Sequence, residues 1–150
     1  MRYTPAQLKE ALDISEDSLR YWRANFPQLK GKRGYAPCFT PGDLLALKVV
    51  AELRDLGMNI GVLKAHADEF FEKCSARPWF DLEKNVLEFD GRSMKLAPKR
   101  SEPSPYGMRV IIPLGPLVRQ LRQRLSEEER LVIQPEIVFP PVAVAKRGAR

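Results

Sequence analysis

Hydrophobic residues recur at helical spacing at the start of the chain. Leu8, Ala11 and Leu12 fall on one face of a short helix. The pair Thr4-Pro5 marks its beginning, because a threonine hydroxyl caps a helix well and a proline in the first turn gives up no hydrogen bond. The residues Leu12-Asp13-Ile14 then predict a turn, so a second helix is expected directly afterwards.

This second helix has one apolar face. Ser15 is its expected N-cap, and Phe26-Pro27 is its expected end, since proline disfavours a helical conformation in the residue before it. Leu19, Trp22 and Phe26 fall at positions i, i+3 and i+7 and are expected to face the core. Two short helices joined by a tight turn predict a helix-turn-helix.

Three residues of the second helix point away from that core. At the helical period, Asp17, Arg20 and Tyr21 fall on the opposite, exposed face. An exposed Arg and Tyr at this place are suited to contact the phosphates or base edges of duplex DNA. Asp17 is suited either to accept a hydrogen bond from cytosine N4 or to interact with the positive end of the helix dipole.

A basic segment follows the second helix. The interval 20–40 contains five basic residues and neither Asp nor Glu, with aromatic residues interleaved. Lys30-Gly31-Lys32-Arg33-Gly34 predicts a flexible cationic tip, and Tyr35 to Phe39 leads back out of it. We expect a hairpin here and call residues 30–39 the wing. A basic wing beside a helix-turn-helix is suited to bind a phosphate backbone, the alternative being an ordinary solvated loop.

Two further helices are expected before residue 75. Thr40-Pro41 repeats the cap-plus-proline start, and Gly57 is expected to end this third helix. Its apolar stripe consists of Leu45, Val49, Leu53 and Leu56. Asn59 is the expected cap of a fourth helix, which ends before Pro78. The buried side of this helix is expected to hold Ile60, Leu63, Ala67 and Phe70 or Phe71.

The second half of the chain has a different pattern. Residues 79–96 alternate as in a hairpin around the turn signal Asp90-Gly91. Residues 97–107 resemble a proline-rich linker, and residues 108–112 predict a strand. Residues 114–131 then predict an amphipathic helix, which is expected to pack on the hairpin or to pair with a second copy, packing being favoured by its short length.

These patterns predict a mainly α fold with a small amount of β structure. Residues 1–74 are expected to form a winged helix-turn-helix of four helices plus the wing. Residues 75–131 are expected to form a small α+β accessory or dimerisation region. Residues 132–150 are rich in Val and Pro, close on basic residues, and are expected to form an extended basic tail.

The positions of the charged residues along the chain support this interpretation. The formal net charge is +6, which favours polyanionic partners but is a weak signal by itself. Residues 1–74 carry 11 basic and 10 acidic side chains, so the wing is a local patch on a nearly neutral region. No apolar stretch approaches the roughly 20 residues of a membrane helix. A cytoplasmic, nucleoid-associated protein is therefore expected.

Catalytic and metal-binding chemistry has little support in the sequence. There is neither a glycine-rich phosphate loop nor a carboxylate pair in a catalytic context, so we expect no enzyme activity and no cofactor. Cys38 and Cys74 are too few for a disulfide framework. Cys74 with His66 is a poor metal-ligand set, because such sites need more soft donors at close spacing. Inert thiols are the expected state.

Taken in order, the motifs of residues 2 to about 72 resemble those of the MerR family of winged helix-turn-helix proteins. The matching residues are Tyr3-Thr4 with Leu8, Ile14-Ser15, the run Ser18 to Trp22, Gly34-Tyr35, Phe39-Thr40 with Asp43-Leu44, and the run Leu53 to Met58. The resemblance implies that Arg20 and Tyr21 contact DNA from the recognition helix and that Arg33 and Tyr35 contact its backbone from the wing. Family members bind as two-fold dimers, so a homodimer is also implied.

Ten residues are therefore candidates for DNA binding. They are Ser15, Asp17, Ser18, Arg20, Tyr21, Arg23, Lys30, Lys32, Arg33 and Tyr35. The cations among them have the alternative of a solvated surface role. The segment Ala36-Pro37-Cys38 departs from the family pattern, which commonly has an Arg after the wing tyrosine, so one phosphate contact is expected to be missing.

The leading hypothesis is a sequence-specific regulator of transcription that binds double-stranded DNA. One alternative is an excisionase-type architectural factor that bends DNA for a recombinase. A second alternative is a protein-interaction adaptor, with residues 75–131 recruiting a protein partner. Footprints at promoter inverted repeats, as opposed to tandem sites at a recombination junction, separate the first two hypotheses.

Overall fold

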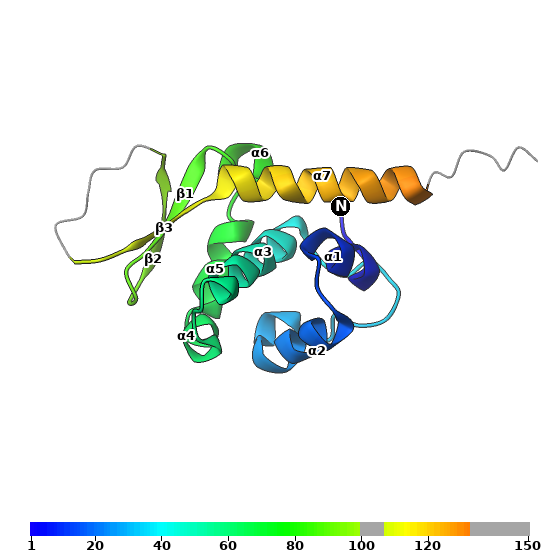
Figure 1. Ribbon diagram of the computed structural model, residues 1–150, viewed down its shortest axis with the longest axis horizontal. Helices are drawn as coiled ribbons and strands as arrows, with labels where there is room; N and C mark the ends of the chain where they lie inside the picture. The colour runs from blue at the N-terminus through cyan, green and yellow to red at the C-terminus, as the bar shows by residue number, and fades with distance from the viewer. Residues whose placement is uncertain (100–106, 133–150) are drawn as a thin grey trace, which may run out of the picture.

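The computed structural model describes residues 1–99 and 107–132. It is mainly helical with a small three-stranded antiparallel sheet, which confirms the predicted fold class (Figure 1). The expected tail lies outside the described residues from 133 onwards. Most of the expected linker also lies outside them, but Ala97 and Pro98 belong to a strand, because backbone pairing with its neighbour continues through Pro98.

The predicted helix-turn-helix is present. Helix α1 spans Pro5–Leu12 and helix α2 spans Glu16–Asn25. The Thr4 hydroxyl accepts from the Gln7 backbone N–H at 3.1 Å, and the Gln7 side chain accepts from the Thr4 N–H at 2.9 Å. Asp13 adopts the left-handed conformation, with φ of 52°, and turns the chain between the two helices.

After Phe26 the chain continues in a short 3-10 helix, η1 (Pro27–Leu29), and then reaches the wing. Helix α3 (Pro41–Asp55) has the expected cap at Thr40. The prediction for Leu56 was wrong, since its side chain is 81% exposed. The helix has ended there, and Gly57, with φ of 94°, turns the chain away from the apolar stripe.

The expected fourth helix is two helices, so the prediction of four helices before residue 75 was also wrong. Helix α4 (Ile60–Ala65) is capped by Asn59, and helix α5 (Ala67–Ser75) starts after His66. His66 leaves the helical conformation, with φ of −112° and ψ of 12°, and its ring contacts Phe89 with the centroids 4.8 Å apart. The break lets the apolar face of α5 turn into the core, where Phe70 and Phe71 are both buried.

The second half begins with a helical turn. Trp79–Leu82 forms helix α6, so the hairpin expected from residue 79 starts later; the Trp79 indole N–H donates to the Pro41 carbonyl at 3.1 Å, and Leu82 is buried. Strands β1 (Asn85–Phe89) and β2 (Met94–Pro98) form the predicted hairpin. Strand β3 (Val110–Pro113) pairs with the other edge of β1, so the order is β2-β1-β3.

Helix α7 (Leu114–Val132) joins the two halves of the chain. It packs on β1, as expected, and also on α1 and α3 (Figure 1). Its buried residues include Leu114, Leu117, Val118, Leu121 and Leu125. They belong to the same hydrophobic cluster as the cores of α1, α2 and α3. In Figure 1, α7 runs along one side of the molecule and α2 lies on the opposite side.

Replacing Leu121 by Ala is expected to destabilise the whole helix-turn-helix region. Leu121 is fully buried, so the loss leaves a cavity and costs about 2–5 kcal/mol of unfolding free energy. Urea unfolding followed by circular dichroism measures this. The exposed neighbour Gln123→Ala should change stability by no more than about 0.5 kcal/mol. Equal stability of the two variants would contradict the shared core.

Candidate nucleic-acid interface

Helix α2 is oriented by what it buries. The residues on its inner side are almost completely buried: Leu19, Trp22 and Phe26. Asp17, Arg20 and Tyr21 lie on the outer side, where the side chains of Asp17 and Arg20 are 90% and 72% exposed and Tyr21 is 50% exposed. The predicted inner and outer faces are therefore both confirmed.

The start of α2 is held by its two serines. The Ser15 hydroxyl accepts from the Ser18 backbone N–H at 3.1 Å and lies 3.1 Å from the Ser18 hydroxyl. This satisfies a backbone donor that the first turn of a helix would otherwise leave unpaired. Ser15 is exposed and Ser18 is half-buried, so both remain at the surface of this face.

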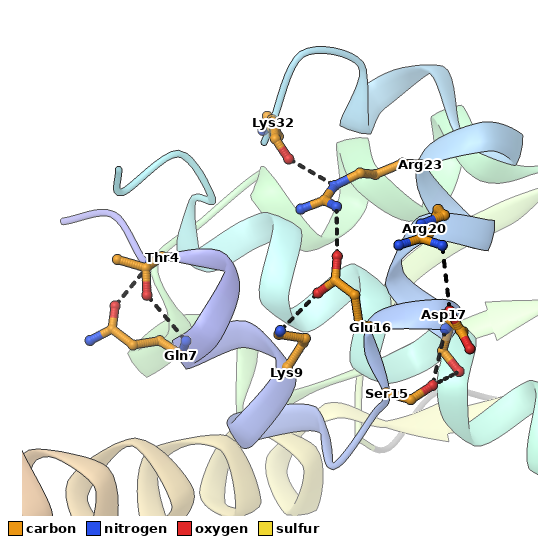
Figure 2. A network of polar contacts seen from close by, with 10 residues as sticks. Thr4, Gln7, Lys9, Ser15, Glu16, Asp17, Arg20, Arg23 and Lys32 are labelled. Carbon is orange, nitrogen blue, oxygen red and sulfur yellow. Dashed lines mark hydrogen bonds and ion pairs between the residues drawn. The ribbon is translucent and has the colours of Figure 1, made fainter. Parts of the chain in front are cut away.

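The exposed cation Arg20 has a weak intramolecular partner. Its guanidinium lies 3.6 Å from the Asp17 carboxylate, one helical turn back (Figure 2). Ion pairs between such exposed side chains contribute from nothing to about 1 kcal/mol. Arg20 therefore loses little when it exchanges this partner for another anion.

Arg23 is placed differently, on the side of α2 that faces the wing. Its Nε donates to the Lys32 backbone carbonyl at 2.9 Å, and its Nη1 lies 3.5 Å from the Glu16 carboxylate (Figure 2). Only 10% of the Arg23 side chain is exposed. The guanidinium thus bridges two segments of the protein.

The Glu16 carboxylate is the centre of a small ionic chain. Besides facing Arg23, it accepts from the Lys9 ammonium of α1 at 2.7 Å (Figure 2). The hydrogen bond from Lys9 lowers the pKa of Glu16 below its ordinary value. Partial burial opposes this, and the positive charges of Lys9, Arg23 and Arg20 lower the pKa further.

The wing is an irregular loop, so the prediction of a hairpin was wrong. Its backbone forms tight turns, in which Lys32 N–H donates to Leu29 and Arg33 N–H to Gly31, in place of a strand ladder. Gly31 and Gly34 have φ of 79° and 87°, a conformation that β-strands do not use. Only Phe39 pairs like a strand, in an isolated bridge with Tyr3.

The side chains of the wing fall into two groups. Lys30, Arg33 and Tyr35 are exposed, and Tyr35 is 99% exposed. The Lys32 ammonium instead pairs with the Asp43 carboxylate at the start of α3, where Asp43 is buried and also accepts from the Thr40 N–H at 2.9 Å.

Three arginines surround one hollow between α2 and the wing. The hollow has a volume of about 370 Å³ and is lined by Arg20, Arg23, Ala24 and Arg33. Arg20 and Arg33 are exposed beside this hollow, and two exposed guanidinium groups suit an anion with several acceptor oxygens, such as a phosphate, whereas the Arg23 guanidinium is engaged with Lys32 and Glu16. Sequence reasoning named the three arginines separately, and the fold brings them to one place.

Comparison with known protein families agrees with this geometry. Residues 3–69 match the family described as MerR HTH family regulatory protein. They form a MerR-type helix-turn-helix region. The resemblance read from the motifs is therefore confirmed over these residues. No curated protein matches the chain. Among the helices that the structure describes, none is long and apolar enough to cross a membrane.

A second hollow also borders α2. It measures about 460 Å³ and lies between α2, the end of α3 and α4, with Tyr21, Trp22, Arg54 and Met58 among its lining residues. The Arg54 guanidinium stacks 5.4 Å from the Trp22 ring centroid. Sequence reasoning missed Arg54 as a surface cation beside Tyr21, although it is part of the family motif Leu53 to Met58.

The cysteines and the histidine of the MerR-type region and its border are apart from these hollows. Cys38 is half-buried, and Cys74 is buried, which raises the pKa of its thiol to about 12. The His66 Nδ1 atom lies 3.3 Å from the Glu69 carboxylate. Within residues 1–99 and 107–132, there is no group of three His, Cys, Asp or Glu side chains suited to hold a metal ion.

Thiol labelling is expected to separate the two cysteines. At about pH 8 the Cys38 thiol of the folded protein should react with a disulfide reagent, while Cys74 reacts only after unfolding, because burial keeps it protonated. Mass spectrometry before and after denaturant measures this, with Cys38→Ser as the control. Equal reaction rates in the folded state would contradict the burial of Cys74.

The variant Glu16→Gln is expected to lose stability near neutral pH and not in acid. Because the folded-state pKa of Glu16 is lowered, its contribution is present above the unfolded pKa and is lost as pH falls through the folded one. Urea unfolding at a series of pH values should show the two proteins converging below about pH 4. A difference that persists unchanged into stronger acid would contradict the ion pairing.

Proposed function

We propose that this protein is a non-enzymatic, sequence-specific regulator that binds double-stranded DNA. Helix α2 enters the major groove, and the wing lies on the adjacent phosphates. One observation carries this proposal: Arg20 and Tyr21 are exposed on the outer face of α2, next to a hollow that Arg20 shares with Arg33 of the wing.

Base contacts are assigned to the outer face of α2. Arg20 has a long donor-rich side chain and a weak partner in Asp17, so it suits guanine or phosphate. Tyr21 offers a hydroxyl and an aromatic ring at the same surface. Asp17 and the two serines at the start of the helix lie close enough along α2 to contact the same groove.

Phosphate contacts are assigned to the exposed cations of the wing, Lys30 and Arg33, with Tyr35 beside them. Such contacts displace counterions, so binding should weaken steeply as salt is raised. Asp17, Glu16 and Asp43 pair with Arg20, Arg23 and Lys32, while Lys30 and Arg33 are exposed on the wing. These two residues are therefore the cations of the wing proposed to face the phosphates.

We further propose that the protein binds as a homodimer on an inverted repeat. A single small module with one recognition helix buries little surface, and pairing two copies raises both affinity and specificity. The surface available for this, or for a separate protein partner, includes the exposed apolar residues Phe80, Met108 and Ile111 of the second half. Cross-linking with and without a selected duplex measures the stoichiometry.

The proposal is tested by selecting duplexes from a random pool with the purified full chain. An enriched inverted repeat supports it, whereas tandem copies of a half-site favour the excisionase-type alternative. If no duplex associates with the protein at low salt, DNA binding is excluded and the adaptor alternative is favoured.

Replacing Arg20 by Met is expected to weaken binding to the selected duplex by about 1–3 kcal/mol and to relax the preference at one base pair. Fluorescence anisotropy on the selected duplex and on point variants of it measures both effects. Arg92→Met is the matched control, since it also removes one exposed cation, from the turn between β1 and β2. Equal losses in both variants would show that only net charge matters.

A further inference from the structure

Arg23 of α2 and Lys32 of the wing are both engaged within the protein. Lys32 is held from both ends: its backbone carbonyl accepts from Arg23 Nε at 2.9 Å, and its ammonium pairs with the buried carboxylate of Asp43. The Lys32 side chain is only 24% exposed. The middle of the wing is therefore fastened to α2 on one side and to α3 on the other.

The Arg23 guanidinium connects this fastening to the rest of the helix-turn-helix. Its second contact is Glu16, and Glu16 in turn accepts from Lys9 of α1 (Figure 2). A planar guanidinium suits this place, because it donates in two directions while its own position is fixed. The chain of contacts runs from α1 through α2 to the wing.

We propose that Arg23 and Lys32 are positioning residues that hold the wing in its binding conformation and do not themselves contact DNA. This inference rests on the proposed DNA-binding function. It leaves Lys30 and Arg33 as the wing cations that contact phosphate, and it gives Arg23 a role that differs from that of Arg20 on the same helix.

The physical reason is the difference between ordering a loop before binding and ordering it during binding. Fixing the backbone of a residue costs conformational entropy. A wing whose central residue is already tied at two points loses less freedom when it meets DNA. If Arg23 turned towards a phosphate, it would leave both the Lys32 carbonyl and the Glu16 carboxylate without this partner.

Salt dependence distinguishes a positioning residue from a phosphate contact. Removing a residue that neutralises a phosphate reduces the magnitude of the slope of log affinity against log salt concentration by about 0.9. Removing a positioning residue weakens binding but leaves this slope unchanged. We therefore expect Arg23→Met to weaken duplex binding about tenfold at constant slope, as for loss of a charged hydrogen bond. Arg33→Met should reduce the slope, with a loss on every duplex sequence.

The matched control is Arg92→Met, which removes an exposed cation from the β1–β2 turn and should leave both affinity and slope near the wild type. If Arg23→Met instead lowers the slope as Arg33→Met does, Arg23 contacts phosphate and the proposal is overturned.

A second measurement needs no DNA. The Lys32 amide donates to the Leu29 carbonyl at 3.1 Å, so its hydrogen exchange reports on the conformation of the wing. NMR of the full chain should show this exchange about tenfold faster in Arg23→Met than in the wild type, and unchanged in Arg33→Met and Arg92→Met. Wild-type exchange in Arg23→Met would overturn the proposal.

Two further outcomes keep the proposal separate from the proposed function. The variant Arg23→Lys keeps the positive charge and is expected to fold even if Arg23→Met does not. Faster hydrogen exchange of the Lys32 amide in Arg23→Lys supports the positioning role of Arg23. Exchange at the wild-type rate overturns that role. If the wild type binds no duplex but the exchange rate of the Lys32 amide still depends on Arg23, the proposed DNA-binding function is wrong. The role of Arg23 in holding the wing is then still supported.

Discussion

Burial of one face of α2 is the constraint on which the candidate interface depends. Leu19, Trp22 and Phe26 leave the helix a single way to lie against α3 and the rest of the core. Because successive residues of a helix are fixed in angle, burying these three side chains decides that Arg20 and Tyr21 face outward. Core packing thus decides which positions of α2 face outward. The residue types at these outward positions can change without altering the orientation of the helix.

Charged contacts hold the middle of the wing, whereas hydrophobic burial orients α2. The wing pairs like a strand only at Phe39, which is buried, and Arg23 and Lys32 with their carboxylate partners connect the middle of the wing to α2 and α3. Half-buried pairs of this kind need both partners, since removing one leaves the other charge poorly solvated. The cations of this segment therefore divide into Arg23 and Lys32, which are engaged within the protein, and Lys30 and Arg33, which are exposed.

The second half of the chain contributes to the same core. Helix α7 packs along α1 and α3 as well as on the sheet, and the Trp79 side chain donates to the start of α3. These contacts lie on the side of the molecule opposite α2 (Figure 1). Within residues 107–132 and the described part before them, the second half thus packs behind the helix-turn-helix and does not cover the outer face of α2, as the proposed function requires.

Local sequence determined the starts of the helices, their inner faces and the basic character of the wing. Helix caps such as Thr4 and Ser15, and an apolar face such as that of Leu19, Trp22 and Phe26, can be predicted from a few neighbouring residues. This is possible because hydrogen bonds and side-chain directions in a helix are local. The break at His66 and the short helix at Trp79 escaped this reading, since contacts with distant strands and helices set them. Only the tertiary structure decided which cations are engaged and where α7 lies. The partners of Lys32 belong to α2 and α3, and α7 packs on α1 and α3, which lie far from it in the sequence. The spacing of residues within one segment does not predict a contact between segments that are so far apart.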